Sequence, residues 1–119
     1  MISKEAKKLI ENNPVAIATC SIGNPDVAVV ADVKIVDDKI LIGDNYLTKT
    51  KDNINKNSKV SIIVWNEDWR NNCFGYKING KAEYLTVGKY YEMVKKIHEG
   101  FPAKGAIVVT VESIKRIGD

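Results

Sequence analysis

The chain of 119 residues contains no apolar run that approaches the ~20 residues needed to cross a bilayer. Its first residues, MISKEAKKLIENN, are polar and amphipathic, so they do not form the apolar segment of a secretory signal. With neither feature in the sequence, we expect a cytoplasmic protein that has no membrane partner.

Cysteine and histidine are also scarce. Cys20 and Cys73 are far apart, with no Cys-x-x-Cys spacing, which favours two reduced structural cysteines and no metal site. His98 is the one histidine, and it falls late in an amphipathic segment. No motif links it to a serine or cysteine, so a surface or helix-end role is favoured over catalysis.

Nucleotide-binding signatures are absent as well. The sequence has no Gly-x-Gly-x-x-Gly and no Walker motif, which disfavours a Rossmann dehydrogenase or an ATPase. No paired carboxylates identify catalytic residues, so any difficult chemistry would belong to a cofactor. The net charge of +3, with dispersed lysines, fits an anionic small ligand and not a nucleic acid.

What is present is a regular apolar patterning that predicts a mainly β chain with short helices, in a single domain over residues 1–119. Six strands are expected at residues 15–22, 27–38, 39–44, 59–67, 74–87 and 106–117, and helices at 3–12, 47–57 and 88–100. Hairpin turns at 23–26 and 37–38 favour an antiparallel sheet. A sheet of this size in a small domain tends to close into a barrel, which removes its edges.

The same patterning predicts details within these elements. Ser3 is expected to cap the first helix, whose apolar face is Ala6, Leu9 and Ile10. Gly80 is expected to mark a bulge or bend in the strand 74–87. The last helix is expected to have an apolar face of Val87, Tyr90, Tyr91, Val94 and Ile97.

The start of the helix 47–57 has an unusual arrangement of charge, in the sequence DNYLTKTKDNI. Lys49 and Lys51 stand in its first turn, where the helix dipole disfavours each cation by about 0.3–1 kcal/mol. This helix end also offers free N–H groups, and Thr48 or Thr50 could cap it or donate a hydroxyl. A bound phosphate would make the lysines favourable; the alternative is that they simply extend into water.

Aromatic residues gather between two strands, in WNEDWRNNCFGY. They are Trp65, Trp69, Phe74 and Tyr76. Aromatic side chains in such a loop could cover a flat conjugated ligand or fill a subunit interface. The alternative is that Trp65 ends its strand in the core while Trp69 rests on the surface.

Three stretches of the chain resemble the pyridoxamine 5′-phosphate oxidase-like family of split-barrel FMN-binding proteins, and above all its small FMN-binding members. They are VAIATCSIGNPDVAVVADVKIVDDKILIGDNYLTKTKDNINKNSKVSIIVW, GYKINGKAEYLTVGKYYE and AIVVTVESI. The most specific feature is an asparagine followed, after a short spacer, by Lys-Thr at a helix start. The resemblance implies a six-stranded split β-barrel that forms a homodimer, with FMN in a groove at the subunit interface.

The resemblance also implies which residues hold the flavin. The strand before the hairpin would contact it largely through the backbone, and Asp44 and Asn45 would lie near the ribityl chain or the ring. The phosphate would bind at Thr48, Lys49 and Thr50. The remaining contacts are Val29, Val30, Ala31 and Asp32 on that strand, and Trp65 and Tyr76 at the ring or the interface.

The implied activity is that of an FMN-dependent oxidoreductase or electron-transfer protein. Two departures argue against oxidation of pyridoxamine phosphate itself. The family's true oxidases carry an arginine where this chain has Val29, and a substrate-binding segment with arginine and histidine where this chain ends VESIKRIGD. The alternatives are a non-enzymatic flavin carrier, or a split barrel that binds deazaflavin or haem, for which only His98 could serve as a histidine ligand.

Overall fold

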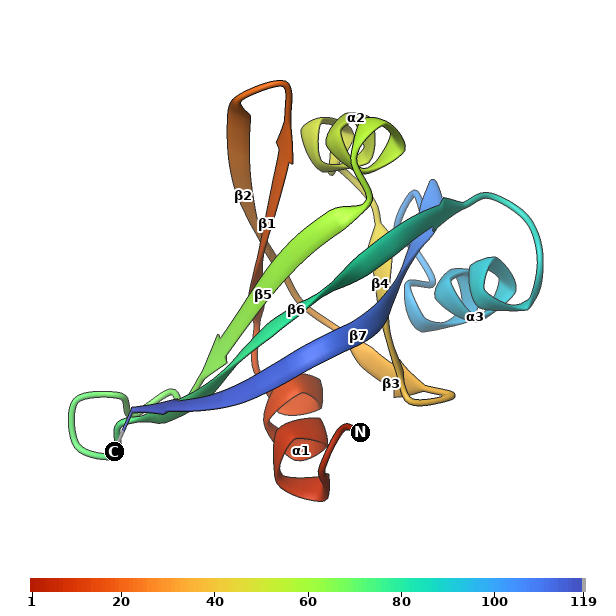
Figure 1. Cartoon of the computed structure of the whole chain (residues 1–119). Coiled ribbons are helices and arrows are strands. Elements are labelled where there is room, and N and C mark those ends of the chain that lie inside the picture. Colours follow the sequence, from red (N-terminus) through yellow and green to blue (C-terminus); the bar gives the residue numbers. More distant parts are fainter. Residues whose placement is uncertain (119) are drawn as a thin grey trace.

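The computed structural model describes residues 1–118, which form a mainly β fold with three short helices (Figure 1). The elements are α1 (Lys4–Asn12), β1 (Val15–Ser21), β2 (Asn24–Val30), β3 (Lys34–Val36), β4 (Lys39–Asp44), α2 (Thr48–Lys56), β5 (Lys59–Trp65), β6 (Phe74–Leu85), α3 (Lys89–Ile97) and β7 (Gly105–Gly118). The strands pair in the order β2-β1-β5-β6-β7-β4-β3, and each pair is antiparallel. The sheet curls into a split barrel, which confirms the expected fold class.

The sheet has seven strands where the sequence predicted six. The expected strand 27–38 is divided into β2 and β3 by residues 31–33. Asp32 has a φ of 56°, a left-handed conformation that aspartate adopts more readily than most residues and that ends the regular pairing of a strand. Alternation of apolar residues continues across this break, which is why the pattern alone did not reveal it.

Two hairpin turns are built from consecutive residues with positive φ. Asp37 and Asp38 have φ values of 53° and 57°, which confirms the predicted turn between β3 and β4. The turn between β1 and β2 uses Ile22 and Gly23, with φ values of 50° and 76°. The predicted position of this turn, residues 23–26, was therefore wrong. Pro25 already belongs to β2 and pairs with Cys20 of β1.

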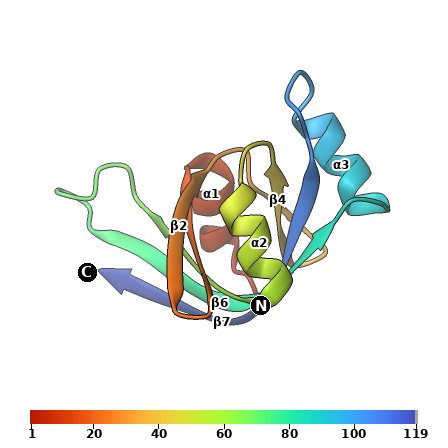
Figure 2. The same cartoon turned by 90° about the horizontal axis from the view of Figure 1, so that it is seen from above.

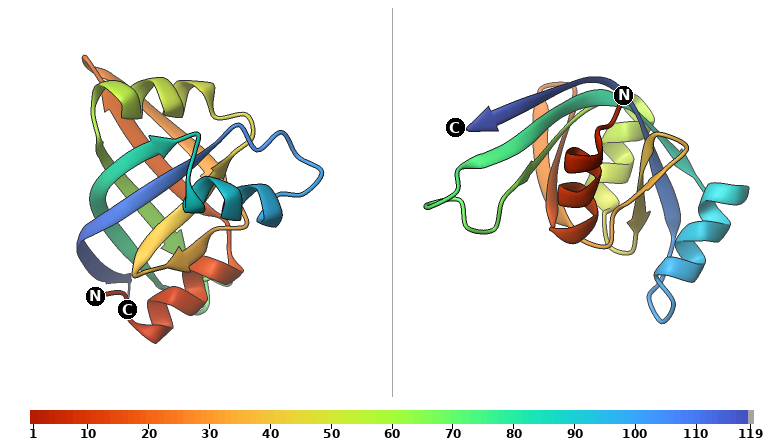
Figure 3. Two further views of the ribbon diagram at one scale, coloured as in Figure 1. Left: turned by 90° about the vertical axis from the view of Figure 1, so that its right-hand side faces the viewer. Right: turned by 90° about the horizontal axis from the view of Figure 1, so that it is seen from below.

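Helices α1 and α2 close opposite ends of the barrel (Figure 3). The Ser3 hydroxyl accepts a hydrogen bond from the Ala6 N–H and so caps α1, as expected. Leu9, Ile10 and Ala6 enter the main core, as predicted, and Ile54 of α2 enters the same core from the other end. A buried Leu or Ile contributes about 1.5–3 kcal/mol, so these contacts hold both helices firmly.

Helix α3 lies outside the barrel, on the side opposite the β5–β6 loop (Figure 2). It packs on β4 and β7 through a second, smaller apolar cluster. The buried members of that cluster are Leu41, Val94, Ala103, Ala106 and Val108. Val87 was expected on the apolar face of this helix, but it precedes the helix and is 76% exposed, so that prediction was wrong.

Strands β6 and β7 form the longest pair in the sheet, and their far ends project beyond the barrel (Figure 2). The pairing register shifts between Asn79 and Gly80, which confirms the expected bulge. A Cβ atom at Gly80 would collide with the Thr110 carbonyl oxygen. Glycine is needed here because the two backbones approach too closely for a side chain.

Candidate functional site

A hollow of about 270 Å³ lies where the end of β2 meets the loop between β4 and α2. We call it the ligand hollow. Its walls are Val29, Val30, Ala31, Asp32, Gly43, Asn45, Tyr46, Leu47, His98 and Phe101.

The ligand hollow brings together most of the flavin contacts expected near the ring. Residues 29–32 form one wall, and Asn45 forms part of another. Asp32 lies at the left-handed break after β2, where peptide N–H and C=O groups are released from the ladder. Free backbone groups of this kind suit contacts made through the main chain, which is how the strand was expected to bind.

Asp44 lies just behind the ligand hollow and is 1% exposed. Its carboxylate accepts a hydrogen bond from the Leu47 N–H at 2.7 Å and another from the Tyr84 hydroxyl. Burial, together with the Asp44 charge, raises the pKa of Tyr84 well above its usual value. Asp44 therefore fixes the turn into α2, and its two donors offset its own negative charge.

The first turn of α2 is open to an anion. The N-cap is Leu47, which has no side-chain oxygen, so the prediction that Thr48 or Thr50 caps the helix was wrong. The first three N–H groups of a helix have no intrahelical acceptor, and the Lys51 N–H is the first to bond back, at 2.8 Å to the Leu47 carbonyl. Thr48 and Lys49 are exposed beside these N–H groups, whereas the Thr50 side chain is buried against the barrel.

Lys51 has a different environment from Lys49. Its ammonium lies 5.1 Å from the centre of the Tyr84 ring, so it already makes a cation–π contact within the protein. Of the two lysines that made the helix start unusual, Lys49 is therefore the one placed for a ligand.

His98 was missed by the sequence reasoning as a residue of this site. It ends α3, as expected, but it is 6% exposed and not on the surface. The Asn45 side-chain nitrogen lies 3.2 Å from His98 Nδ1, and the Asn45 side-chain oxygen accepts from the Ala103 N–H at 2.9 Å. His98 and Asn45 are separated by 53 residues in the chain, so no local pattern could have paired them.

Trp65 and Tyr76 lie elsewhere in the single chain. The Tyr76 side chain is buried in the main core, and its hydroxyl donates to the carboxylate of Glu5 on α1. Trp65 is exposed on the outside of the sheet, so the alternative that it ends its strand in the core was wrong. Trp65 and Trp69 line a shallow depression there with Ile63 and Ile117.

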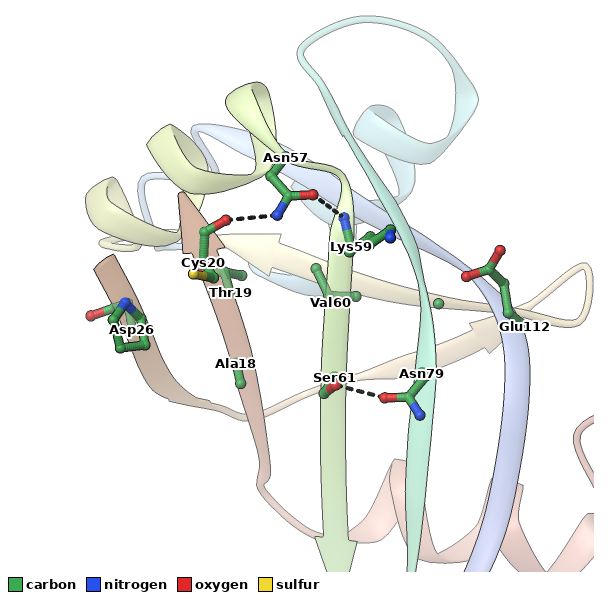
Figure 4. Close-up of a pocket in the computed structure, with 12 residues that line it drawn as sticks. Ala18, Thr19, Cys20, Asp26, Asn57, Lys59, Val60, Ser61, Asn79 and Glu112 are labelled. Carbon is green, nitrogen blue, oxygen red and sulfur yellow. Dashed lines mark hydrogen bonds between the residues drawn. The ribbon is translucent and has the colours of Figure 1, made fainter. Parts of the chain in front are cut away.

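A larger hollow, of about 430 Å³, lies on the outer face of the sheet near the end of α2 (Figure 4). We call it the outer-face hollow. Three of its polar side chains bond to neighbours in the protein: the Ser61 hydroxyl donates to Asn79 at 2.6 Å, and the Asn57 amide donates to the Cys20 carbonyl at 3.0 Å (Figure 4). It contains none of the expected flavin contacts.

Metal ligands do not cluster in residues 1–118: no group of three His, Cys, Asp or Glu side chains there could hold an ion. Cys20 and Cys73 are both free thiols. No helix within the same residues is long and apolar enough to cross a membrane.

Comparison with known proteins places these features in a family. A family model described as pyridoxamine 5′-phosphate oxidase matches residues 2–118. An uncharacterized protein of Methanocaldococcus jannaschii is 32% identical over 123 residues, which cover 95% of this chain and 78% of that protein.

Solved structures agree with this match. HupZ of group A Streptococcus has a TM-score of 0.88 at 31% identity, with 98% of this chain and 94% of that one covered. An FMN-binding protein of Syntrophomonas wolfei has a TM-score of 0.83 at 21% identity, with 96% and 84% covered, a likeness that shows the fold alone. The match over nearly the whole length shows that this chain belongs to the pyridoxamine 5′-phosphate oxidase family.

Proposed function

We propose that this protein is a homodimer that binds FMN and uses it to transfer electrons or hydride. Its substrate is not pyridoxamine phosphate. The observation that carries the proposal is the junction of the ligand hollow with the uncapped start of α2. Leu47 is both the N-cap of α2 and a wall of the ligand hollow. A ligand with a planar ring and a phosphate arm would therefore find a recess and an anion site side by side.

The phosphate binds at the first turn of α2. The free N–H groups of Thr48, Lys49 and Thr50 supply donors and the positive end of the helix dipole. Lys49 adds a full charge, and the Thr48 hydroxyl is exposed beside it. Thr50 contributes through its backbone, because its side chain is buried.

The ring of the flavin occupies the ligand hollow, against residues 29–32 and Asn45. When bound, FMN supplies the redox chemistry, and the protein orients it and shields it from water. An arginine at position 29 would add a second charge near the phosphate, but this chain has Val29 there. Lys49 and the end of α2 therefore provide the phosphate binding without that arginine.

The homodimer forms through the outer face of the sheet. Ala16 pairs with Val29 on one side and Ile63 on the other, so these three side chains form one row on that face. Val27 pairs with Ala18 in the next exposed row, and Trp65 extends the patch. Patches of exposed apolar side chains on neighbouring strands mark interaction surfaces.

The same surface explains why the flavin would lie at the subunit interface. Val29 belongs to the exposed row and also lines the ligand hollow. A second copy seated on the outer face would therefore reach the rim of the ligand hollow. Its Trp65 and Trp69 would then be available to cover the ring, although they lie away from the ligand hollow of their own chain.

The first test is the visible absorption spectrum of the purified protein before and after FMN is added, followed by gel filtration. We expect twin flavin bands that elute with the protein at one FMN per chain. A protein that stays colourless and fails to retain FMN would contradict the proposal. Deazaflavin and haem would be tried in the same way, since each has its own spectrum.

The spectrum does not separate an enzyme from a carrier, so a second assay is needed. Steady-state oxidation of NADH or NADPH with a defined electron acceptor would support an oxidoreductase. A protein that holds FMN but shows no turnover with either donor would be a flavin carrier.

A further inference from the structure

The Asn45 amide has only one orientation that satisfies both of its partners. The Ala103 backbone N–H can only donate, so the Asn45 atom that faces it must be the oxygen. The Asn45 amide nitrogen then faces His98 Nδ1 at 3.2 Å. Because that amide nitrogen can only donate, His98 Nδ1 must accept and carries no proton.

It follows that His98 is a neutral imidazole with its proton on Nε2. Protonation of Nδ1 would place two donors face to face. Rotation of the amide would not relieve this, because it would turn the Asn45 nitrogen toward the Ala103 N–H. Only the Nε2–H tautomer preserves both bonds.

The Nε2–H group is an unused donor on a residue that lines the ligand hollow. No hydrogen bond to Nε2 occurs within residues 1–118. Yet no buried side-chain nitrogen or oxygen in that part of the chain lacks a partner, so Nε2 must reach accessible space. The imidazole lies over Gly43, where a Cβ atom would come within 2.6 Å of Nε2, and both residues line the ligand hollow.

We propose that His98 is a ligand-contacting residue of the flavin site, which donates its Nε2 proton to an acceptor atom on the edge of the bound ring. This role of His98 rests on the proposed function. It extends that proposal by assigning the end of α3 and the following loop to the flavin site. The edges of flavin and deazaflavin rings carry carbonyl oxygens and ring nitrogens that accept such a bond. The Phe101 ring packs edge-on against the imidazole, with the two ring centres 6.4 Å apart and the ring planes nearly perpendicular.

The same geometry argues that His98 is not an axial ligand to haem iron. A coordinating nitrogen must be unprotonated, and a ligating histidine usually donates its other N–H to an acceptor. Here the unprotonated nitrogen is Nδ1, which already accepts from Asn45, and Nε2 holds the proton. For Nε2 to bind iron, the proton would have to move to Nδ1, which would cost the bond between Asn45 and His98 or, if the amide turned, the bond between Asn45 and Ala103.

The first experiment is a long-range ¹H–¹⁵N NMR spectrum of the full chain, labelled with ¹⁵N and prepared without a histidine tag. His98 is the one histidine, so its two ring nitrogens need no further assignment. We expect a pyridine-like Nδ1 signal and a pyrrole-like Nε2 signal near neutral pH. The reversed pattern would overturn the proposal.

The second experiment measures the dissociation constant for FMN by fluorescence in the wild type and two variants. His98→Phe keeps a ring over Gly43 but has no donor, and we expect binding about tenfold weaker, as for loss of one hydrogen bond. His98→Gln retains an N–H donor, and we expect it to recover most of that loss. Urea unfolding of both variants shows whether the fold is intact.

The outcomes separate the two proposals. FMN binding by His98→Phe within twofold of the wild type would overturn the role of His98 alone. A wild type that binds neither FMN nor deazaflavin would overturn both proposals. Haem binding with a histidine-ligated spectrum that disappears in His98→Phe would overturn the assigned tautomer and the donor role together.

Discussion

The ligand hollow and the outer-face hollow differ in a way that volume does not convey. The outer-face hollow is larger, about 430 Å³ against about 270 Å³, but its Ser61, Asn79 and Asn57 side chains already bond to protein partners. The ligand hollow is smaller and has unused donors, at His98 Nε2 and at the first turn of α2 beside it. The ligand hollow is therefore distinguished by a buried histidine and a helix end with unused donors, and not by its volume.

The two regions also differ in how they are assembled. The outer-face hollow is built mostly on the neighbouring strands β1, β5 and β6. The ligand hollow joins a strand break at Asp32, a loop after β4 and the end of α3. Its walls therefore come from segments that are distant in the sequence and meet only in the folded chain.

The largest expected effect comes from reversing the charge of Lys49. Lys49→Glu should weaken FMN binding by about 100-fold or more, since a charge-assisted bond is lost and repulsion is gained. The free energy of unfolding should stay the same or rise by about 0.3–1 kcal/mol, because a glutamate is favourable at a helix N-terminus. FMN titration and urea unfolding measure the two quantities.

The matched control is Lys56→Glu, the same charge change on an exposed residue in the last turn of the same helix. It should leave FMN affinity nearly unchanged. Stoichiometric flavin in purified Lys49→Glu would remove the assignment of the phosphate site to α2.

The next largest effect tests whether the outer face of the sheet is the interface of the homodimer. Val27→Arg places a charge on the exposed apolar rows and should raise the dimer dissociation constant by about tenfold or more, because an unpaired charge is costly in an interface. Val87→Arg is the matched control, on a loop at 76% exposure against 67% for Val27. Sedimentation velocity would measure both, and equal behaviour of the two variants would argue against this interface.

A smaller effect concerns the support behind the ligand hollow. Tyr84→Phe removes a donor from the buried Asp44 carboxylate and should lower the free energy of unfolding by about 1–2 kcal/mol. Tyr91→Phe is the control: Tyr91 is also half-buried, and its hydroxyl makes no hydrogen bond within residues 1–118. Urea unfolding at neutral pH compares the two, and equal stabilities would show that the Tyr84 bond contributes little.

The raised pKa of Tyr84 gives the same bond a dependence on pH. Its stabilising contribution is complete below the usual tyrosine pKa of about 10 and is lost as pH rises toward the folded-state value. The wild type should therefore lose stability at strongly alkaline pH more steeply than Tyr84→Phe. Parallel curves for the two proteins would contradict this.

The smallest effect tests how α3, which carries His98, is attached. Asp37 accepts bonds from Lys89 at 2.7 Å and Tyr90 at 2.8 Å, and the hydrogen bond from Lys89 is the main cause of its lowered pKa. A lowered carboxylate pKa adds stability that is present above the usual pKa and is lost as pH falls through the folded value. Asp37→Asn should be slightly less stable than the wild type at pH 7, and the difference should vanish in acid.

Glu67→Gln serves as the control for that change, since Glu67 is exposed and has no hydrogen bond or ion pair in the part of the chain described. Its stability at pH 7 should match that of the wild type, because no hydrogen bond or ion pair is lost. Because Asp37 is exposed, solvent screens its ion pair and keeps the effect small.

Much of the fold could be predicted from local patterns. The cap at Ser3, the apolar face of α1 and the turn at Asp37 and Asp38 depend on residues within a few positions of one another. The strand break at Asp32 could not be predicted, because the apolar alternation of the sequence runs through it unchanged. Val87 was misplaced because it continues the helical spacing although Gly88 begins the helix.

The sequence by itself determined the antiparallel mainly β fold and the cationic start of α2, since hydrophobic periodicity and the charge of a helix turn are local properties. Only the tertiary structure decided that His98 belongs to the ligand hollow, that Asp44 supports α2 from behind, and that Trp65 faces outward. These arrangements depend on hydrogen bonds and packing between segments that are distant in the chain. Barrel closure brings such segments together, and local sequence carries no record of which ones will meet.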